Sequence, residues 1–238
     1  MKLLAGTSGY AFKEWKGSFY PADLKEAGML AYYATRFPTV EINNTFYRLP
    51  KQNVLLDWVS QVPESFTFAL KASQRITHFA RLKAEAAGPL EFLLKNTQVM
   101  GSRLGPILFQ LPPNLKKDLD RLRNFLALLP PERKFAIEFR HASWFEDDVY
   151  ELLRVRDVAL CAIEQPDFAS PLVSTASWGY LRLHRLDYDG TALSGWAGRV
   201  SAQTWNEVYV YFKHDEGTGS GPPAVDEFLQ ASAKDQRR

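Results

Sequence analysis

Residues 134–144 read Lys-Phe-Ala-Ile-Glu-Phe-Arg-His-Ala-Ser-Trp, and this stretch is the part of the sequence that decides the fold. Successive side chains of a strand point to opposite faces, so the alternation gives this strand two different faces. The apolar face consists of Phe135, Ile137 and Phe139. The other face carries the carboxylate of Glu138 and the guanidinium of Arg140. Such a strand is typical of an α/β barrel, where one face contacts helices and the other points at the axis and its open end.

The rest of the chain alternates strand patterns with helix patterns. Short apolar runs predict further strands at residues 2–7, 39–42, 66–71, 107–111, 159–163, 180–183 and 208–212. Helical spacing of apolar residues predicts helices at 24–37, 54–59, 89–104, 119–129, 149–153 and from Pro222 onward. We expect an irregular segment after the strand at 159–163, and a loop through Trp196 after the strand at 180–183.

This alternation has neither a linker nor an internal repeat, and it predicts a single TIM-type (β/α)8 barrel of the α/β class. The domain would span residues 1–238, with a frayed tail at 234–238. The alternative is an open doubly wound sheet, which calls for a G-x-G-x-x-G turn after its first strand. Residues 6–9 read Gly-Thr-Ser-Gly and lack that pattern, so the barrel is favoured.

The composition is that of an ordinary globular protein, with 238 residues of which 46% are hydrophobic and 24% charged. The net charge of +2 neither requires nor excludes a nucleic-acid partner. The single cysteine, Cys161, lies in an apolar run, which indicates a buried thiol in a reducing compartment. No signal-peptide pattern opens the chain, and no apolar run reaches the length of a membrane span. We therefore expect a cytoplasmic protein without a membrane partner, and its oligomeric state stays open.

Polar side chains share one face and one end of nearly every predicted strand. The residues that alternate inward at the C-terminal ends are Glu41, Asn43, Lys71, Gln110, Glu138, Arg140, Glu164, Arg182, His184, Tyr211 and Lys213. Active sites of α/β barrels are built from these strand ends and the loops that follow them. Scattered surface charges would not share both a face and an end, so the coincidence predicts a functional site.

The charges of this set predict an anionic ligand. Lys71, Arg140 and Arg182 are cationic, and guanidinium groups bind phosphate and carboxylate groups bidentately. We therefore expect an enzyme that acts by acid–base chemistry on a small phosphorylated or carboxylated molecule. Glu41 or Glu138 would be the general base, with Lys71 or His184 as the acid. The expected catalytic residues are Glu41, Lys71, Glu138, Arg140 and His184. The expected substrate-binding residues are Tyr10, Asn43, Tyr47, Gln110, His141, Arg182 and Tyr211.

Two other interpretations of these charged residues stay open. The charges could neutralise one another in a structural ion-pair network, because buried charges must be paired. The carboxylates of Glu41 and Glu138, with His141 and His184, could instead hold a divalent metal. Neighbouring Lys and Arg residues oppose a bound cation, and no H-x-H or H-E-x-x-H spacing occurs, so we predict no cofactor.

The predicted loops at this end of the barrel are rich in aromatic residues. Tyr10 and Tyr47 carry a hydroxyl group beside polar turns and are expected in the site. The other large rings are expected to form a small core of their own, and they include Phe12, Trp15, Phe46 and Trp144. Aromatic rings among basic groups also stack nucleobases. A nucleic-acid-associated protein or a metal-assisted phosphoesterase is therefore the alternative function, and a non-catalytic binding module is a further one.

Several motifs carry a resemblance to a known family. They are Gly6-Thr-Ser-Gly-Tyr10, Val40-Glu-Ile-Asn-Asn-Thr-Phe-Tyr-Arg48, Phe68-Ala-Leu-Lys-Ala72, Leu104-Gly-Pro-Ile-Leu-Phe-Gln-Leu-Pro-Pro113, Ala136-Ile-Glu-Phe-Arg-His-Ala-Ser-Trp144, Tyr180-Leu-Arg-Leu-His184 and Tyr209-Val-Tyr-Phe212. With these motifs, which run from the first strand to the last, the chain resembles the YecE-like family, a domain-of-unknown-function family. The resemblance implies a TIM-barrel-like fold and no established activity.

The chain departs from the family pattern at two places near the predicted site. Lys213-His214 stands where paired asparagines are usual, and Arg185 stands where the family usually has a glycine. Both changes add charge or bulk at this end of the barrel.

Overall fold

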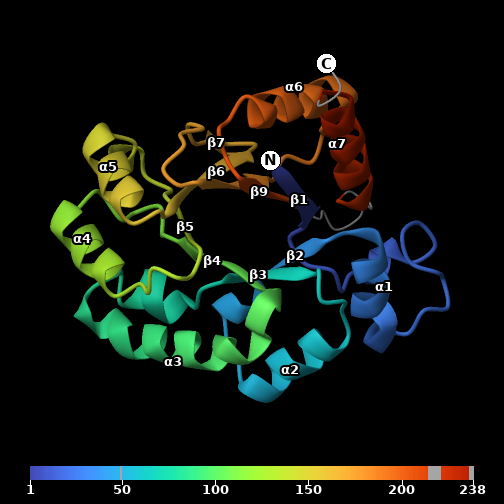
Figure 1. Ribbon diagram of the computed structural model, residues 1–238, viewed down its shortest axis with the longest axis horizontal. Helices are drawn as coiled ribbons and strands as arrows, with labels where there is room; N and C mark the ends of the chain where they lie inside the picture. Colours follow the sequence, from blue (N-terminus) through green and yellow to red (C-terminus); the bar gives the residue numbers. More distant parts are fainter. Residues whose placement is uncertain (49, 214–220, 236–238) are drawn as a thin grey trace.

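A ring of parallel strands forms the centre of the structure (Figure 1). The structure is a computed structural model, and it describes residues 1–48, 50–213 and 221–235. The strands are β1 (Lys2–Thr7), β2 (Thr39–Ile42), β3 (Thr67–Lys71), β4 (Leu104–Gln110), β5 (Phe135–Glu138), β6 (Ala159–Gln165), β7 (Phe168–Ala169), β8 (Trp178–Leu183) and β9 (Glu207–Phe212). Neighbours pair in the order β1-β9-β8-β6-β5-β4-β3-β2, and all of these pairs are parallel. Only the short β7 is antiparallel, against β6. The predicted α/β barrel is confirmed.

The ring closes between β1 and β2 without a regular ladder. One bridge joins Ser8 to Glu41, and a tyrosine hydroxyl group spans the rest of the seam. Thr7 N donates to the Tyr33 hydroxyl at 2.8 Å, and that hydroxyl donates to Thr39 O at 3.1 Å. A Cβ atom on Gly6 would lie 2.0 Å from Thr39 O, so the two strands approach this closely only because residue 6 has no side chain.

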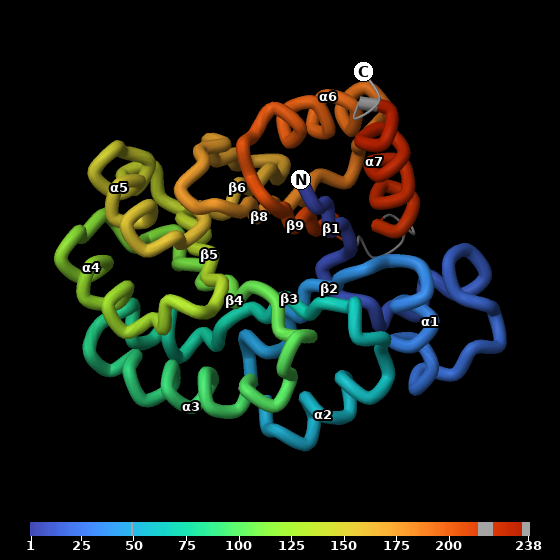
Figure 2. The backbone as a smooth tube through the Cα atoms, in the orientation of Figure 1, coloured from blue at the N-terminus to red at the C-terminus, as the bar shows by residue number. Residues whose placement is uncertain are grey.

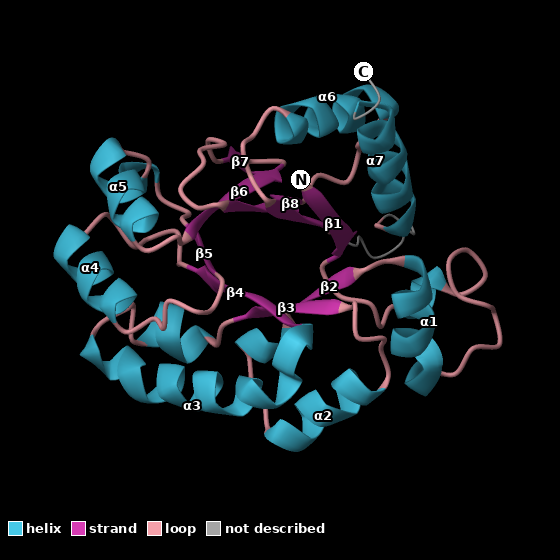
Figure 3. Ribbon diagram, in the orientation of Figure 1, coloured by secondary structure: helices cyan, strands magenta, loops and turns pink. Residues whose placement is uncertain are grey.

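Helices surround the ring on its outer side, as Figures 2 and 3 show. They are α1 (Met29–Arg36), α2 (Gln52–Ser60), α3 (Ala87–Thr97), α4 (Leu119–Ala127), α5 (Asp147–Val155), α6 (Gly190–Ser201) and α7 (Pro222–Asp235). Two of them begin at an aspartate N-cap: Asp118 accepts from Arg121 N, and Asp189 accepts from Ala192 N. No described α-helix connects β6 to β8, where β7 and an extended segment take its place.

The core has an inner and an outer part because the strand side chains alternate. Leu108, Ala136, Tyr180 and Tyr209 belong to a buried cluster inside the barrel. The opposite faces of the strands pack against helices; Phe135, for example, joins a cluster with residues of α3, α4 and α5. Both parts are apolar, so the hydrophobic effect buries both faces of the strands, and the polar side chains at the strand ends distinguish the inward face.

Strand β6 corrects one part of the sequence analysis. We expected Glu164 to face inward, but Cys161 lies in the inner cluster, and Ala162, on the same face of the strand as Glu164, lies in an outer one. The run from Val158 to Ile163 is apolar throughout, so its alternation gives no signal for either face. The thiol of Cys161 is buried, as expected.

Other boundaries also differ from the prediction. The predicted loop through Trp196 is the helix α6, in which Trp196 is buried against the sheet. Leu104 begins β4 rather than ending a helix. Helix α7 runs to Asp235, and residues 236–238 of the expected tail lie outside the described residues, as does His214. Among the described helices, none combines the length and the apolar character needed to cross a bilayer.

Candidate active site

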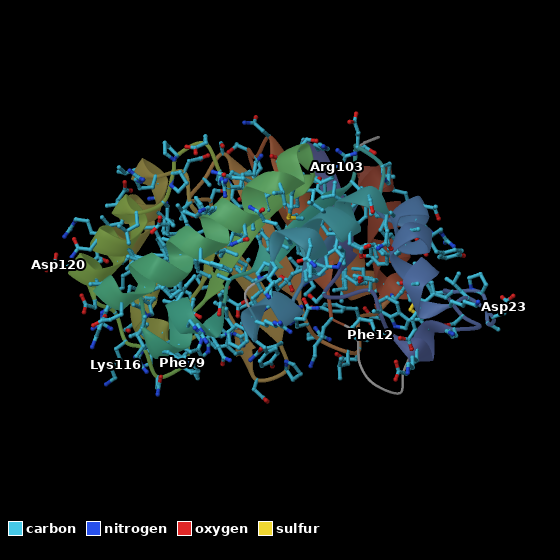
Figure 4. All side chains as sticks on the ribbon, turned by 90° about the horizontal axis from the view of Figure 1, so that it is seen from below. Phe12, Asp23, Phe79, Arg103, Lys116 and Asp120 are labelled. Atoms are coloured by element: carbon cyan, nitrogen blue, oxygen red, sulfur yellow. The ribbon has the colours of Figure 1, made fainter. Side chains whose placement is uncertain are left out.

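The C-terminal ends of the strands lie on one face of the barrel. Figure 4 shows Phe12, Phe79 and Lys116, which follow β1, β3 and β4, toward one edge of the molecule. Arg103, which directly precedes β4, lies at the opposite edge. The face that carries the loops after the strands is called the C-terminal face below, and it is where active sites of α/β barrels occur.

Arg182, near the end of β8, lies between two buried glutamates. Its Nη1 is 2.7 Å from Glu138 Oε2, and its Nη2 is 3.0 Å from Glu41 Oε1. Its Nε is 3.0 Å from Glu41 Oε2. Both glutamates are fully buried and Arg182 is 4% exposed. The strands β2, β5 and β8 thus bring one cation and two anions together, as the alternation of side chains along these strands predicted.

Glu41 has further donors on both of its oxygens. Ser8 Oγ donates to Oε1 at 2.8 Å, and the Tyr180 hydroxyl donates to Oε2 at 2.7 Å. Asn43 Nδ2 donates to Oε1 at 3.1 Å. Burial alone would raise the pKa of Glu41, but Arg182 with the Tyr180 and Ser8 hydrogen bonds holds that pKa below its ordinary value. A carboxylate held this firmly in its anionic form is a poor proton acceptor, so its geometry suits the positioning of Arg182.

Glu138 connects the buried ions to the accessible surface of the face. Its Oε1 accepts from Arg140 Nε, while its Oε2 is taken by Arg182. Arg140 Nη1 also donates to Gln165 Oε1 at 2.5 Å. The Arg140 side chain is 16% exposed, so this guanidinium reaches solvent although one of its edges is paired.

Lys71, at the end of β3, is the cation without a carboxylate. In the part of the chain that the structure describes, its Nζ makes neither a hydrogen bond nor an ion pair, and it lies 4.2 Å from the centre of the Phe46 ring. Burial and the charge of Arg182 lower the pKa of Lys71 to about 8. The amine therefore changes its charge near neutral pH.

His184 lies beside Ser8 at the edge of this network. Its Nε2 is 3.1 Å from Ser8 Oγ, and its backbone N–H donates to Glu164 O at 2.7 Å. Burial and then the charge of Arg182 hold the pKa of His184 well below its ordinary value. The imidazole is therefore neutral at pH 7 and is a weak base.

Four more of the predicted residues lie on the C-terminal face. Asn43, Gln110 and His141 are partly exposed, and Tyr47 is 75% exposed. Asn43 Oδ1 accepts from Arg182 at 3.3 Å. His141 Nδ1 accepts from Ser143 N at 3.2 Å, which leaves Nε2 for a ligand.

Tyr10, Tyr211 and Glu164 have other surroundings. Tyr10 packs on Tyr33 of α1, and its pKa is raised by burial and by Asp57 of α2. Tyr211 is fully buried inside the barrel, where its hydroxyl lies 2.7 Å from Thr39 Oγ1.

Glu164 and Arg185 belong to the surroundings of α6. Glu164 Oε2 accepts from the Tyr188 hydroxyl at 2.7 Å and from Trp196 Nε1 at 2.8 Å. Arg185, one of the departures from the family pattern, pairs with Asp187 at 3.1 Å and lies 3.9 Å from Glu164.

The side chains of the alternative metal site, Glu41, Glu138, His141 and His184, are not arranged around a common point. Arg182 occupies the space between the carboxylates of Glu41 and Glu138. Within residues 1–48, 50–213 and 221–235, no group of three or more His, Cys, Asp or Glu side chains is arranged to hold a metal ion.

Sequence reasoning missed two contributors to this site. Ser8 follows β1 with the same parity as Leu4, which points inward, so the alternation of that strand could have identified it. Gln165 was not predicted as a site residue because the inward face of β6 was assigned to the wrong residues. A third feature, the ring of Phe46 beneath Lys71, depends on a loop and has no signal in the sequence.

Residues 4–238 match the family model described as protein of unknown function DUF72. The chain belongs to the DUF72 family. This result confirms the resemblance to YecE-like proteins and covers every strand described above except the first two residues of β1.

Two curated relatives carry names without a function. The UPF0759 protein YecE of Escherichia coli K12 is 36% identical over 117 residues, which are 49% of this chain and 43% of that protein. The match therefore spans less than half the length of YecE. The UPF0759 protein YunF of Bacillus subtilis is 26% identical over 213 residues, which are 84% of this chain and 75% of YunF.

Solved DUF72 structures share the fold. A DUF72 protein from Thermotoga maritima matches with a TM-score of 0.80 at 24% identity, over the whole of both chains. One from Enterococcus faecalis matches with a TM-score of 0.82 at 18% identity, over 97% of this chain and 95% of that one. At these identities the likeness concerns the barrel alone.

Proposed function

We propose that this DUF72 protein is an enzyme that binds a small phosphorylated or carboxylated molecule on the C-terminal face and acts on it by acid–base chemistry. The observation that carries the proposal is the charge balance of the site. Among the described residues, Lys71, Arg140 and Arg182 face two carboxylates, and both carboxylates are already paired with guanidinium groups. An anion supplied by a ligand would complete this set.

The accessible groups suit different parts of this task. Arg140 reaches solvent and would orient the anion, with Gln110 and Asn43 as neutral hydrogen-bonding partners. Lys71 would move protons, because an amine with a pKa of about 8 exchanges a proton near pH 7, and the neutral imidazole of His184 would form a hydrogen bond with the ligand. Glu41 and Glu138 would hold Arg182 in place beneath the ligand. The single buried cysteine supports a cytoplasmic location.

A thermal-shift screen with inorganic phosphate, glyoxylate and phosphorylated metabolites tests this proposal. We expect at least one anion to raise the melting temperature of the wild type, and the Arg140→Gln variant to lose most of that increase. Lys116→Gln is the matched control, because it removes one positive charge from an exposed position on the same face. The proposal fails if none of the anions stabilises the protein, or if Lys116→Gln loses as much as Arg140→Gln.

A second candidate function rests on exposed aromatic rings near the same cations. Tyr47 is 75% exposed and Phe79 is 70% exposed, and rings of this kind stack the bases of single-stranded nucleic acids. This candidate predicts binding of a short oligonucleotide that weakens steeply with salt and weakens further in a Tyr47→Ala, Phe79→Ala double variant. Binding that is independent of salt, or unchanged by the double variant, would remove it.

A further inference from the structure

Lys71 is unusual among the lysines of this chain because it lies near carboxylates and pairs with none of them. Lys13, Lys117 and Lys134 each form an ion pair. Near Lys71, the oxygens of Glu41 and Glu138 are occupied by Arg182 and Arg140. The amine thus lies at the end of a strand and over an aromatic ring, and no described residue forms a hydrogen bond or an ion pair with its nitrogen.

The backbone at Lys71 and the ring beside its amine are also held in place. Thr45 Oγ1 donates to Lys71 O at 2.6 Å, which fixes the strand end against the loop that carries Phe46. The ring of Phe46 packs edge-on against His78, with 4.9 Å between the ring centres. An amine on a preorganised support loses little freedom when it reacts.

We propose that Lys71 is a nucleophile that forms an imine with the substrate, which makes the substrate an aldehyde or ketone that also carries a carboxylate or phosphate group. This inference rests on the proposed function, because the anionic group would be held by Arg140. A lysine becomes nucleophilic when it is desolvated or lies next to another cationic group. Lys71 is desolvated by burial, and the charge of Arg182 acts on it. With a pKa of about 8, about a tenth of the Lys71 side chains carry a neutral amine at pH 7.

The reaction balances without an oxidant, a reductant or a metal. The nitrogen lone pair of the neutral amine attacks the carbonyl carbon, a C–N bond forms, and the carbonyl oxygen takes up a proton. Loss of one amine proton and of the new hydroxyl group as water then gives the C=N bond. Solvent water exchanges the protons in these steps, because Lys71 is partly exposed.

Reductive trapping tests the proposal on the wild-type protein. Glyoxylate, the smallest carbonyl compound with a carboxylate, is added with sodium cyanoborohydride, which delivers a hydride to the imine carbon and leaves a carboxymethyl group on the amine. Peptide mapping by mass spectrometry then measures the rate at each lysine. We expect Lys71 to react about tenfold faster than the exposed Lys116 at pH 7, because its larger fraction of free amine outweighs the lower nucleophilicity of a weaker base.

The pH dependence separates an imine from simple charge attraction. Trapping at Lys71 should rise as the pH increases through about 8, because the free amine is the reacting form. Anion binding by the ammonium group would weaken over the same interval. Arg140→Gln should slow trapping at Lys71 and leave trapping at Lys116 unchanged.

Two outcomes are informative in different ways. If Lys71 is modified no faster than Lys116, the imine proposal is wrong. If phosphate and glyoxylate still raise the melting temperature in an Arg140-dependent manner, the proposed anion-binding function stands without it. Failure of both measurements would remove the proposed function together with the imine.

Discussion

Arg182 is the residue around which the buried part of the site is arranged. Two fully buried glutamates accept its hydrogen bonds, and their charges raise the pKa of Arg182 by more than burial lowers it. Replacing such a network by apolar residues is often neutral or stabilising, whereas breaking it leaves an unpaired buried charge. The network is therefore a costly feature if it only serves stability.

The first prediction concerns Glu41. Glu41→Gln keeps the shape of the side chain but removes the charge opposite Arg182, so we expect the free energy of unfolding to fall by about 3–5 kcal/mol. Urea denaturation measures this change. Asp120→Asn, which breaks an exposed pair with Arg123, is the control and should be close to wild type. Equal effects of the two substitutions would contradict the view that burial makes the Glu41–Arg182 pair important.

The second prediction concerns the pH dependence that His184 causes. The folded state holds its pKa well below the ordinary value of 6.5, so the unfolded chain binds a proton that the folded chain does not bind. Stability from this residue is present above pH 6.5 and falls as the pH decreases below it, by about 1.4 kcal/mol per pH unit.

His184→Gln should flatten this part of the stability curve. Urea denaturation between about pH 5 and 8 checks the slope, and His141→Gln, on the same face but partly exposed, is the control. A slope that persists in His184→Gln would show that another group takes up the proton.

At the scale of the elements, helix α6 depends on one carboxylate of β6. Glu164 Oε2 accepts from Trp196 of the helix and from Tyr188 just before it, so this glutamate attaches the helix to the sheet. The sequence analysis wrongly placed Glu164 among the inward residues. The strand before it is apolar on both faces, so the alternation of side chains does not show which face points inward. The sequence analysis also did not predict helix α6. Gly190, Ser194, Gly195 and Gly198 have low helix propensity, and they interrupt the helical spacing of apolar residues.

The third prediction follows from this attachment. Glu164→Leu should lower the free energy of unfolding by about 1–3 kcal/mol, because the Trp196 N–H and the Tyr188 hydroxyl lose their acceptor. The same variant should keep the anion-dependent rise in melting temperature, since Glu164 points away from Lys71 and Arg140. Loss of anion binding in this variant would place Glu164 in the site after all.

At the scale of the whole molecule, the barrel depends on a seam that a side chain completes. The Tyr33 hydroxyl replaces the backbone hydrogen bonds that β1 and β2 do not make, and Gly6 lets the strands approach. Glu41 and Arg182 are far apart in the sequence. The eight parallel strands bring them side by side only when this seam is closed.

The fourth prediction tests the seam. Tyr33→Phe should lower the free energy of unfolding by about 1–3 kcal/mol, because the buried N–H of Thr7 loses its acceptor. Tyr32→Phe, in the same helix, is the matched control and should have little effect. Both are compared by urea denaturation. Similar losses in the two variants would show that the hydroxyl group does not close the ring.

The sequence by itself determined the class of fold and most of the charged residues that meet at the C-terminal face. Alternation along strands such as residues 135–140 is a local property, so it specified inward residues wherever one face was polar, as at Glu41, Glu138 and Arg182. Only the tertiary structure decided the partners of these residues. It pairs both carboxylates with guanidinium groups, leaves the amine of Lys71 over the Phe46 ring, and turns Glu164 to the outside. Pairing depends on distances between strands far apart in the chain, and no periodicity within a single strand encodes those distances.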